Sequence, residues 1–206
     1  MKPSTLLVEL LTEELPPKSL KRLGTAFGQG IFQELSRQLF TASTECQMYM
    51  TPRRLSVVIP DVLDCQPRQQ IERKGPSVTA AYDSDGKPTK ALEGFMRSCQ
   101  TTQEGLSTSE DGQYIVFKAV KEGEKLEVCL ATIVEEVAKS LPIPKMMHWG
   151  DTDYTFVRPV QGLVMLLGDH VIPGTVFGQS SRKITQGHRF LGEGQITISC
   201  AERYEL

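Results

Sequence analysis

Cationic side chains beside proline or glycine are the residues of this sequence best suited to binding a charged partner. They occupy four breaks between apolar segments: Thr51-Pro52-Arg53-Arg54-Leu55, Arg73-Lys74-Gly75-Pro76, Phe156-Val157-Arg158-Pro159 and Gly187-His188-Arg189-Phe190. Proline fixes φ and glycine permits close backbone approach, so each break holds a cation at a defined place. A guanidinium is planar, permanently charged and forked, which suits phosphate and carboxylate groups. The candidate nucleic-acid-binding residues are therefore Arg53, Arg54, Arg73, Lys74, Arg158 and Arg189.

The same residues also fit a structural role. Surface cations commonly contribute little energy and bind nothing specific. Alternatively, these arginines hold loops in place by bonding buried carbonyls or carboxylates, and Glu9, Glu13 and Glu14 are carboxylates available for this. Residue types and spacing do not decide between the two roles.

No motif in the chain indicates a self-contained active site, so we assign no catalytic residue. The glycine-rich phosphate loop, the dinucleotide-binding glycine pattern, the nucleophile elbow and the zinc-protease motif are all missing from the sequence. His188 beside Arg189 could contact phosphate or act as a base, but one histidine without an orienting partner is more typical of a structural or surface residue. Trp149 could stack on a base, although a single tryptophan beside methionines is more typical of a core anchor.

Composition narrows the class of protein. The chain has 206 residues, of which 39% are hydrophobic and 23% charged, and its formal net charge is −2. This is ordinary for a globular chain, and it excludes a wholly basic nucleic-acid coat. The five cysteines are dispersed and the three histidines lie far apart, which predicts reduced thiols and no metal site. The longest uncharged apolar stretch, residues 159–168, is too short to span a bilayer, so we expect a cytoplasmic protein with no membrane partner.

Hydrophobic periodicity predicts the secondary structure. Strands are expected at 5–11, 46–50, 55–59, 70–73, 114–120, 163–167, 170–177 and 195–199, and helices at 18–40, 89–99 and 125–141. The first helix should bury Leu20, Leu23, Phe27, Ile31, Leu35 and Leu39 on one face. Gly24 and Gly28 weaken this helix but permit close packing against a neighbouring element.

The order of these elements predicts an α+β fold with a mixed or antiparallel sheet and two longer amphipathic helices, since helices and strands do not alternate strictly. One region spanning residues 1–206 is expected, with two subdomains allowed by a break near 141–150. Residues 201–206 are typical of the start of a helix that stops without a cap, which suggests a segment of a longer protein.

The four cationic breaks belong to a longer series of short motifs along the chain. The further members are Leu7-Val8-Glu9-Leu10-Leu11-Thr12-Glu13-Glu14-Leu15-Pro16-Pro17-Lys18 and Leu141-Pro142-Ile143-Pro144-Lys145-Met146-Met147-His148-Trp149-Gly150. In this order and spacing, the motifs resemble the N-terminal part of the beta subunit of the bacterial two-subunit glycyl-tRNA synthetase, from about residue 5 to the end. One departure is Met147-His148, where a basic residue is expected before the tryptophan, which puts a phosphate role for position 148 in doubt.

This resemblance implies a function and a set of partners. The enzyme joins glycine to tRNA-Gly, and the alpha subunit carries the activation site and uses ATP and Mg, so this region would bind no cofactor itself. The beta subunit serves tRNA binding, and its HD-like and anticodon-binding domains would lie beyond this chain in an alpha2-beta2 tetramer. The fold would be similar to the B3/B4 region of the phenylalanyl-tRNA synthetase beta subunit. Three roles stay open: a noncatalytic tRNA-binding or scaffold module, a purely structural or interaction domain, and a hydrolytic editing module.

Overall fold

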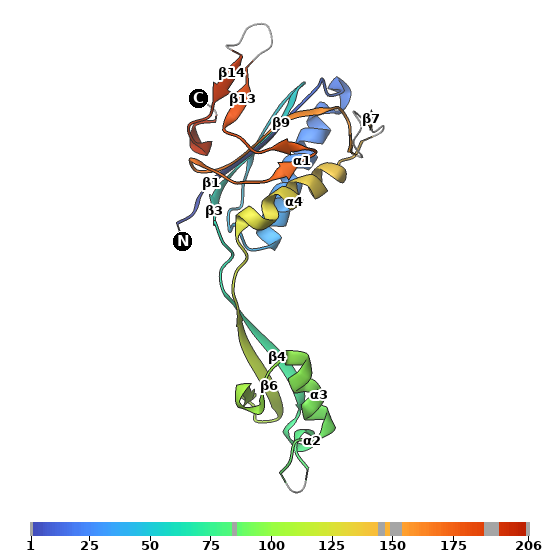
Figure 1. The fold of residues 1–206 in the computed structure, drawn as a ribbon, viewed down its shortest axis with the longest axis vertical. Coiled ribbons are helices and arrows are strands. Elements are labelled where there is room, and N and C mark those ends of the chain that lie inside the picture. Colours follow the sequence, from blue (N-terminus) through green and yellow to red (C-terminus); the bar gives the residue numbers. More distant parts are fainter. Residues whose placement is uncertain (1, 84–85, 144–146, 149–153, 188–193, 205–206) are drawn as a thin grey trace. The chain divides into compact units, whose positions relative to one another are not determined.

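The chain folds into two compact units. The computed structural model describes residues 2–83, 86–143, 147–148, 154–187 and 194–204. The larger unit comprises residues 1–66 and 124–206, and the smaller unit is the segment 67–123 inserted between them. Figure 1 labels the main elements of both units. The break near 141–150 considered from sequence falls partly outside the described residues, and the two units found here are bounded elsewhere.

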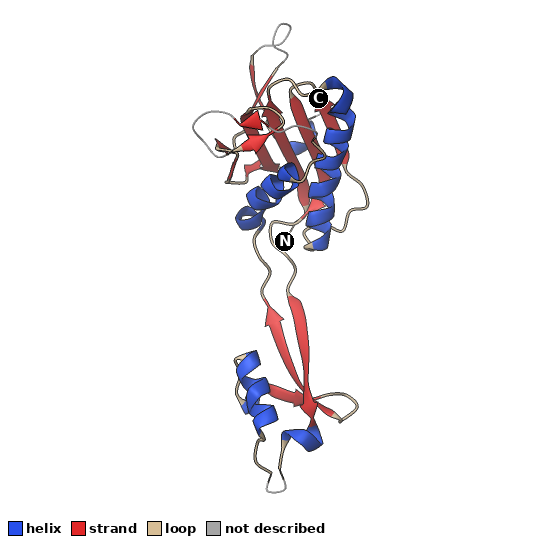
Figure 2. Cartoon of the chain, turned by 90° about the vertical axis from the view of Figure 1, so that its right-hand side faces the viewer, coloured by secondary structure: helices blue, strands red, loops and turns tan. Residues whose placement is uncertain are grey.

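A five-stranded antiparallel sheet is the centre of the larger unit (Figure 2). Its strands, in spatial order, are β10 (His170–Val171), β9 (Val160–Leu167), β1 (Ser4–Thr12), β3 (Arg54–Val62) and β2 (Gln47–Thr51). In the central strand β1, Glu9 pairs with Ser56 of β3 and Val164 of β9. Because side chains alternate between the two faces, Leu6, Val8 and Leu10 point to one side of the sheet while Leu7 and Glu9 point to the other.

Two helices, α1 (Pro17–Arg37) and α4 (Leu126–Lys139), pack on the first face. Pro17 at the first helical position suits the start of α1, because that position needs no backbone N–H. The prediction about its glycines is confirmed: a Cβ on Gly28 would lie 2.3 Å from Met48 Cγ, and one on Gly24 would lie 2.8 Å from Met50 Sδ. Because glycine has no side chain, Gly24 and Gly28 let α1 pack close to strand β2.

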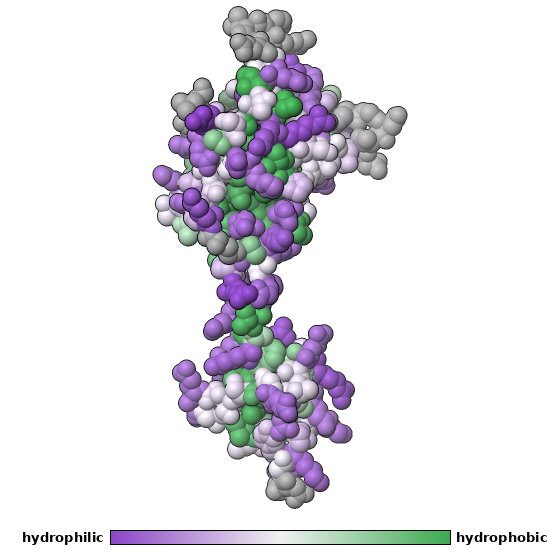
Figure 3. Space-filling model, turned by 60° about the vertical axis from the view of Figure 1, so that its left-hand side comes forward, coloured by the Kyte–Doolittle hydropathy of each residue, from purple (hydrophilic) through white to green (hydrophobic). Residues whose placement is uncertain are grey.

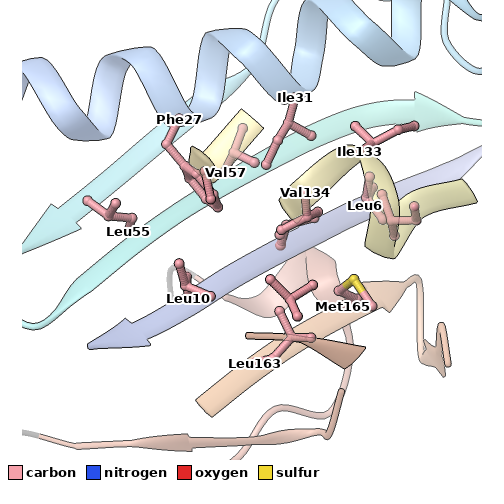
Figure 4. Close-up of a cluster of buried hydrophobic side chains, with 14 of the residues drawn as sticks. Leu6, Leu10, Phe27, Ile31, Leu55, Val57, Ile133, Val134, Leu163 and Met165 are labelled. Atoms are coloured by element: carbon pink, nitrogen blue, oxygen red, sulfur yellow. The ribbon is translucent and has the colours of Figure 1, made fainter. Parts of the chain in front are cut away.

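The main core lies between these helices and the sheet (Figure 4). Phe27 and Ile31 of α1 and Ile133 and Val134 of α4 meet the sheet side chains, Leu10 among them. Each of these five is at most 3% exposed, and burying one such side chain contributes about 1.5–3 kcal/mol. This apolar layer fixes the sheet whose strand ends carry the arginines.

The second face of the sheet is covered by the last part of the chain. The hairpin of β13 (Ile184–Gln186) and β14 (Gln195–Thr197) is followed by the short 3₁₀ helix η2 (Ala201–Arg203). Ile198, Ala201 and Tyr204 pack with Leu7, Val58, Val164 and Leu166. We call residues 184–186 and 195–204 the C-terminal strap.

Two further strand pairs complete the larger unit. They are β7 (Met147–His148) with β8 (Thr155–Phe156), and β11 (Thr175–Val176) with β12 (Gln179–Ser180). Phe156 and Phe177 stack at 5.2 Å between ring centroids and join the main core.

The smaller unit is a three-stranded antiparallel sheet with short helices. Its elements are β4 (Gln69–Ser77), α2 (Val78–Ala81), α3 (Lys90–Cys99), the 3₁₀ helix η1 (Gln103–Gly105), β5 (Leu106–Thr108) and β6 (Tyr114–Lys121), with strand order β4-β6-β5. Its small core is formed by Ala81, Leu92 and Ile115. The surfaces seen in Figure 3 mix hydrophilic side chains with smaller apolar areas.

The sequence expectations hold for the class and for most elements. The fold is α+β, and every strand ladder among the described residues is antiparallel. Two details are wrong. Helix α1 ends at Arg37 rather than near residue 40, because Leu39 adopts a left-handed φ of 62° and turns outward, 45% exposed, while Phe40 enters the core. The single strand expected at 170–177 is divided into β10 and β11.

Candidate functional site

A cleft of about 740 Å³ lies at one end of the five-stranded sheet. Three segments of the sheet form it: residues 11–14 at the end of β1, residues 51–54 at the turn from β2 to β3, and Gln161 of β9. Gln186, Gly187, Gly194 and Gln195 at the hairpin β13–β14 complete the lining. The Thr-Pro-Arg-Arg break and the Glu-Glu pair singled out from sequence thus meet in one place.

Arg53 is held inside a closed set of polar contacts in this cleft. Its Nη2 donates to Gln161 Oε1 at 3.0 Å and lies 3.3 Å from Glu13 Oε2, and the Gln161 amide donates in turn to Glu13. The adjoining backbone is fixed as well, because the Thr12 N–H donates to the Arg53 carbonyl at 2.9 Å. A phosphate that bound Arg53 would have to compete with Glu13.

Arg54 points behind the cleft to a fully buried carboxylate. Its Nε lies 3.0 Å from Glu9 Oε2, and Glu9 is 0% exposed. The geometry at Nε is that of an ion pair without a hydrogen bond, so this N–H has no hydrogen-bond acceptor among the described residues. Its Nη2 donates to the carbonyl of Gln186. Arg54 therefore links the sheet to the hairpin β13–β14.

Glu9 collects two further partners from the C-terminal strap. The hydroxyl of Thr185 donates to Oε1, and the hydroxyl of Tyr204 donates to Oε2. The Tyr204 hydroxyl also lies 2.6 Å from Ser56 Oγ. Burial, and then the negative charge of Glu9, raise the pKa of Tyr204 far above its usual value, so this hydroxyl stays a donor.

Arg158 lies in the connection between β8 and β9 and contacts Glu14, one of the residues that line the cleft. Its Nε donates to the carbonyl of Glu14 at 3.0 Å, and its Nη1 donates to the carbonyl of Val157 at 3.0 Å. The same Nη1 lies 3.0 Å from Met147 Sδ. This guanidinium thus bonds the segment that joins β1 to α1.

Arg73 and Lys74 belong to the smaller unit and have no carboxylate within ion-pair distance among the described residues. Arg73 makes one bond, from Nη1 to the carbonyl of Ser98 at 3.3 Å. Lys74 Nζ sits 3.4 Å from the centroid of the Tyr114 ring. Its charge helps lower the pKa of Asp111, after the larger effects of hydrogen bonds from Ser109 and the Gln113 backbone.

The remaining candidates fall outside the described residues. These are Arg189 and His188, as well as Trp149. The candidate set is therefore divided: Arg53 and Arg54 share the cleft, Arg158 lies beside its edge, and Arg73 and Lys74 lie in the other unit.

Sequence reasoning missed Gln161, Thr185 and Tyr204, which supply most of the contacts to Glu9, Glu13 and Arg53. A signal for Glu9 was present, since it is the one charged residue inside the apolar segment 5–11. No signal identified its partners, which lie 176 and 195 positions further along the chain.

Neither a metal-binding cluster nor a membrane-spanning helix is found among the described residues. No three potential metal-binding side chains come together there. In the same residues, no helix is long and apolar enough to cross a membrane.

Comparison with known proteins identifies the family. The profile described as "Glycyl-tRNA synthetase beta subunit" matches residues 6–206. The chain is 41% identical over 206 residues to the glycine–tRNA ligase beta subunit of Escherichia coli O8 (strain IAI1), which covers 99% of this chain and 30% of that protein. It is 43% identical over 201 residues to the beta subunit of Histophilus somni (strain 129Pt), covering 96% of this chain and 29% of that protein. The chain thus spans about 30% of the length of these relatives. It belongs to the glycyl-tRNA synthetase beta subunit family.

Proposed function

We propose that this chain is a noncatalytic scaffold module of a glycine–tRNA ligase, the enzyme that charges tRNA-Gly with glycine at the expense of ATP. Its partners would be the rest of the beta subunit, the alpha subunit of an alpha2-beta2 tetramer, and tRNA-Gly, in the cytoplasm. Family membership supports the enzyme assignment. The likeness of the fold to the B3/B4 region of the phenylalanyl enzyme is part of this proposal.

One observation supports scaffolding over phosphate binding in the larger unit. Each described arginine candidate there already has acceptors within the chain: Glu13 and Gln161 for Arg53, Glu9 and Gln186 for Arg54, and the Glu14 carbonyl for Arg158. These groups lie on different strands or loops, so each guanidinium fixes two segments relative to each other. A phosphate would have to share each guanidinium with these acceptors.

The double variant Arg53→Ala/Arg54→Ala tests this role. Loss of Arg54 leaves the Glu9 carboxylate buried without its cation, which should cost about 3–5 kcal/mol of stability. We expect a large fall in melting temperature and an unchanged Kd for tRNA-Gly, measured well below the new melting temperature in the complete enzyme. Arg53→Ala alone provides a milder variant.

Arg68→Ala/Arg97→Ala is the matched control, because it removes two exposed cations and should leave the melting temperature almost unchanged. The scaffold role is contradicted if Arg53→Ala/Arg54→Ala melts like the parent protein while its affinity falls for all tRNAs with a shallower salt dependence.

A second candidate function is contact with the tRNA backbone through the smaller unit. It is favoured by Arg73 and Lys74, which have no carboxylate partner within ion-pair distance among the described residues. If both touch phosphates, Arg73→Ala/Lys74→Ala should weaken binding to different tRNAs alike. It should also reduce the slope of log K against log salt by roughly 1 for each lost contact. An unchanged slope would remove this candidate.

The hydrolytic alternative gains no support from the cleft. Thr12 lines the cleft and its hydroxyl is buried. Its Oγ1 has no hydrogen-bond partner among the described residues, so no base is in place to activate it. A nucleophile needs a base within hydrogen-bond reach to become activated. Release of amino acid from mischarged tRNA by the purified chain would revive this alternative.

A further inference from the structure

The two faces of the five-stranded sheet are covered in different ways. The helix-covered face is joined to α1 and α4 by a broad apolar cluster. On the other face, the C-terminal strap contributes only Ile198, Ala201 and the half-buried Tyr204 to the apolar cluster. The two hairpin isoleucines add little, because Ile184 is 39% and Ile196 is 45% exposed.

Few backbone hydrogen bonds hold the strap to the sheet. Ala201 N–H donates to the Gly168 carbonyl at 2.8 Å, and the Glu202 carboxylate accepts from the Thr5 N–H at 3.3 Å. The bond from Ile198 N–H ends on Lys183, just before the hairpin itself. A segment with few buried apolar contacts and few such bonds is expected to open at a lower free energy than the rest of its domain.

The strongest tie is polar and lies at the centre of the covered face. The Glu9 carboxylate, on the central strand, accepts hydroxyl hydrogen bonds from Thr185 in β13 and from Tyr204 after η2. These donors come from the two ends of the strap. A fully buried carboxylate that lost them would be left with an incomplete set of hydrogen bonds, so the two contacts are energetically coupled.

The same strap forms one wall of the cleft. Gln186 and Gln195 line the cleft, and the Gln186 carbonyl accepts from Arg54, whose Nε lies against Glu9. Movement of the strap away from Glu9 would therefore also remove the acceptor of Arg54 and widen the cleft.

We infer that the C-terminal strap is a conformational device that opens from the sheet as one unit, with Glu9 as its latch, and that this opening controls access to the cleft. The helix-covered face stays folded during the opening. The inference does not depend on the proposed function, because it concerns only contacts within the larger unit.

Hydrogen–deuterium exchange of the complete protein tests the device with the double variant Thr185→Val/Tyr204→Phe. Both substitutions keep the shape of the side chain and remove only the hydroxyls that donate to Glu9. The amides of Ala201 and Arg182, whose hydrogen bonds to the carbonyls of Gly168 and Leu163 connect the two ends of the strap region to β9 and the turn after it, should exchange at least tenfold faster and by similar factors. Amides of β1 beneath the helices, such as that of Val8, should change less than twofold.

Thr132→Val/Tyr154→Phe is the matched control, since Thr132 is an exposed residue of α4 and neither residue belongs to the strap. It should leave strap exchange unchanged. Three outcomes of the strap variant would overturn the inference: no increase in exchange, an equal increase in β1, or faster exchange of Ala201 while Arg182 keeps its parent rate.

Discussion

The larger unit buries part of its charge network, whereas the ion pairs described in the smaller unit are exposed. In the larger unit, Arg54 reaches a carboxylate that is 0% exposed, and the Arg53–Glu13 pair forms part of the cleft wall. In the smaller unit, the Lys118–Glu72 pair spans 3.5 Å with both side chains more than half exposed. The Arg54–Glu9 and Lys118–Glu72 ion pairs therefore differ in energy, because burial decides how much a charge interaction contributes.

The larger unit also has the larger hydrophobic core. The larger unit buries apolar side chains on both faces of its sheet, whereas Ala81, Leu92 and Ile115 make the buried cluster of the smaller unit. A small domain buries a smaller fraction of its surface and is correspondingly less stable. Substitutions in the two units should therefore separate clearly in their effects.

The largest expected effect comes from breaking the buried network. Glu9→Ala removes the acceptor of Thr185 and Tyr204 and the counter-charge of Arg54, and should lower the free energy of unfolding by about 3–5 kcal/mol. Glu72→Ala, which removes an exposed partner in the smaller unit, should cost at most about 1 kcal/mol. Urea unfolding of both variants measures the difference, and equal losses would refute the contrast between the units.

A smaller effect is expected from the close approach of helix and strand in the smaller unit. A Cβ on Gly75 would lie 2.6 Å from Phe95 Cε1, so Gly75→Ala must shift a ring that packs on the core and should cost about 1–3 kcal/mol. Gly94→Ala in the same helix α3 meets nothing within 4 Å and should stabilise by about 0.5–1 kcal/mol. Thermal melts of the two variants should shift in opposite directions; a shift of the same sign would contradict the packing argument.

The smallest effect should follow removal of the smaller unit altogether. The Gln66 N–H donates to the Glu124 carbonyl at 2.9 Å, so the two chain ends of the larger unit lie side by side. Replacing residues 67–123 with Asn-Gly closes this pair with a two-residue hairpin loop. We expect a cooperative melt within a few degrees of the parent transition for the larger unit, followed by circular dichroism. Loss of cooperative melting would show that the larger unit depends on the insertion.

Much of the fold could be predicted from local pattern. The spacing of Leu23, Phe27, Ile31 and Leu35 gave α1 its buried face, and Gly24 and Gly28 indicated a close neighbour. The end of α1 could not be predicted, because Leu39 is apolar and continues the spacing of the buried helix face. Only the left-handed turn at Leu39, which sends Phe40 into the core, ends the helix earlier.

The candidate site was predicted in part. Glu9 and Glu13 were named as possible carboxylate partners and do pair with arginines, but the particular pairs Arg53–Glu13 and Arg54–Glu9 were not predicted. The hydroxyl partners Thr185 and Tyr204 carry no signal, since single threonines and tyrosines near the end of a chain are unremarkable in any sequence.

The amino-acid sequence by itself determined the fold class, most of the helices and strands, and the family, since these depend on periodicity and on the order of short motifs. The tertiary structure alone decided which cations lie against carboxylates, that a cleft forms at the strand ends, and that Glu9 gathers residues from three distant segments. The physical reason is that a charge interaction depends on burial and distance between residues far apart in the chain, and neither quantity is encoded in local spacing.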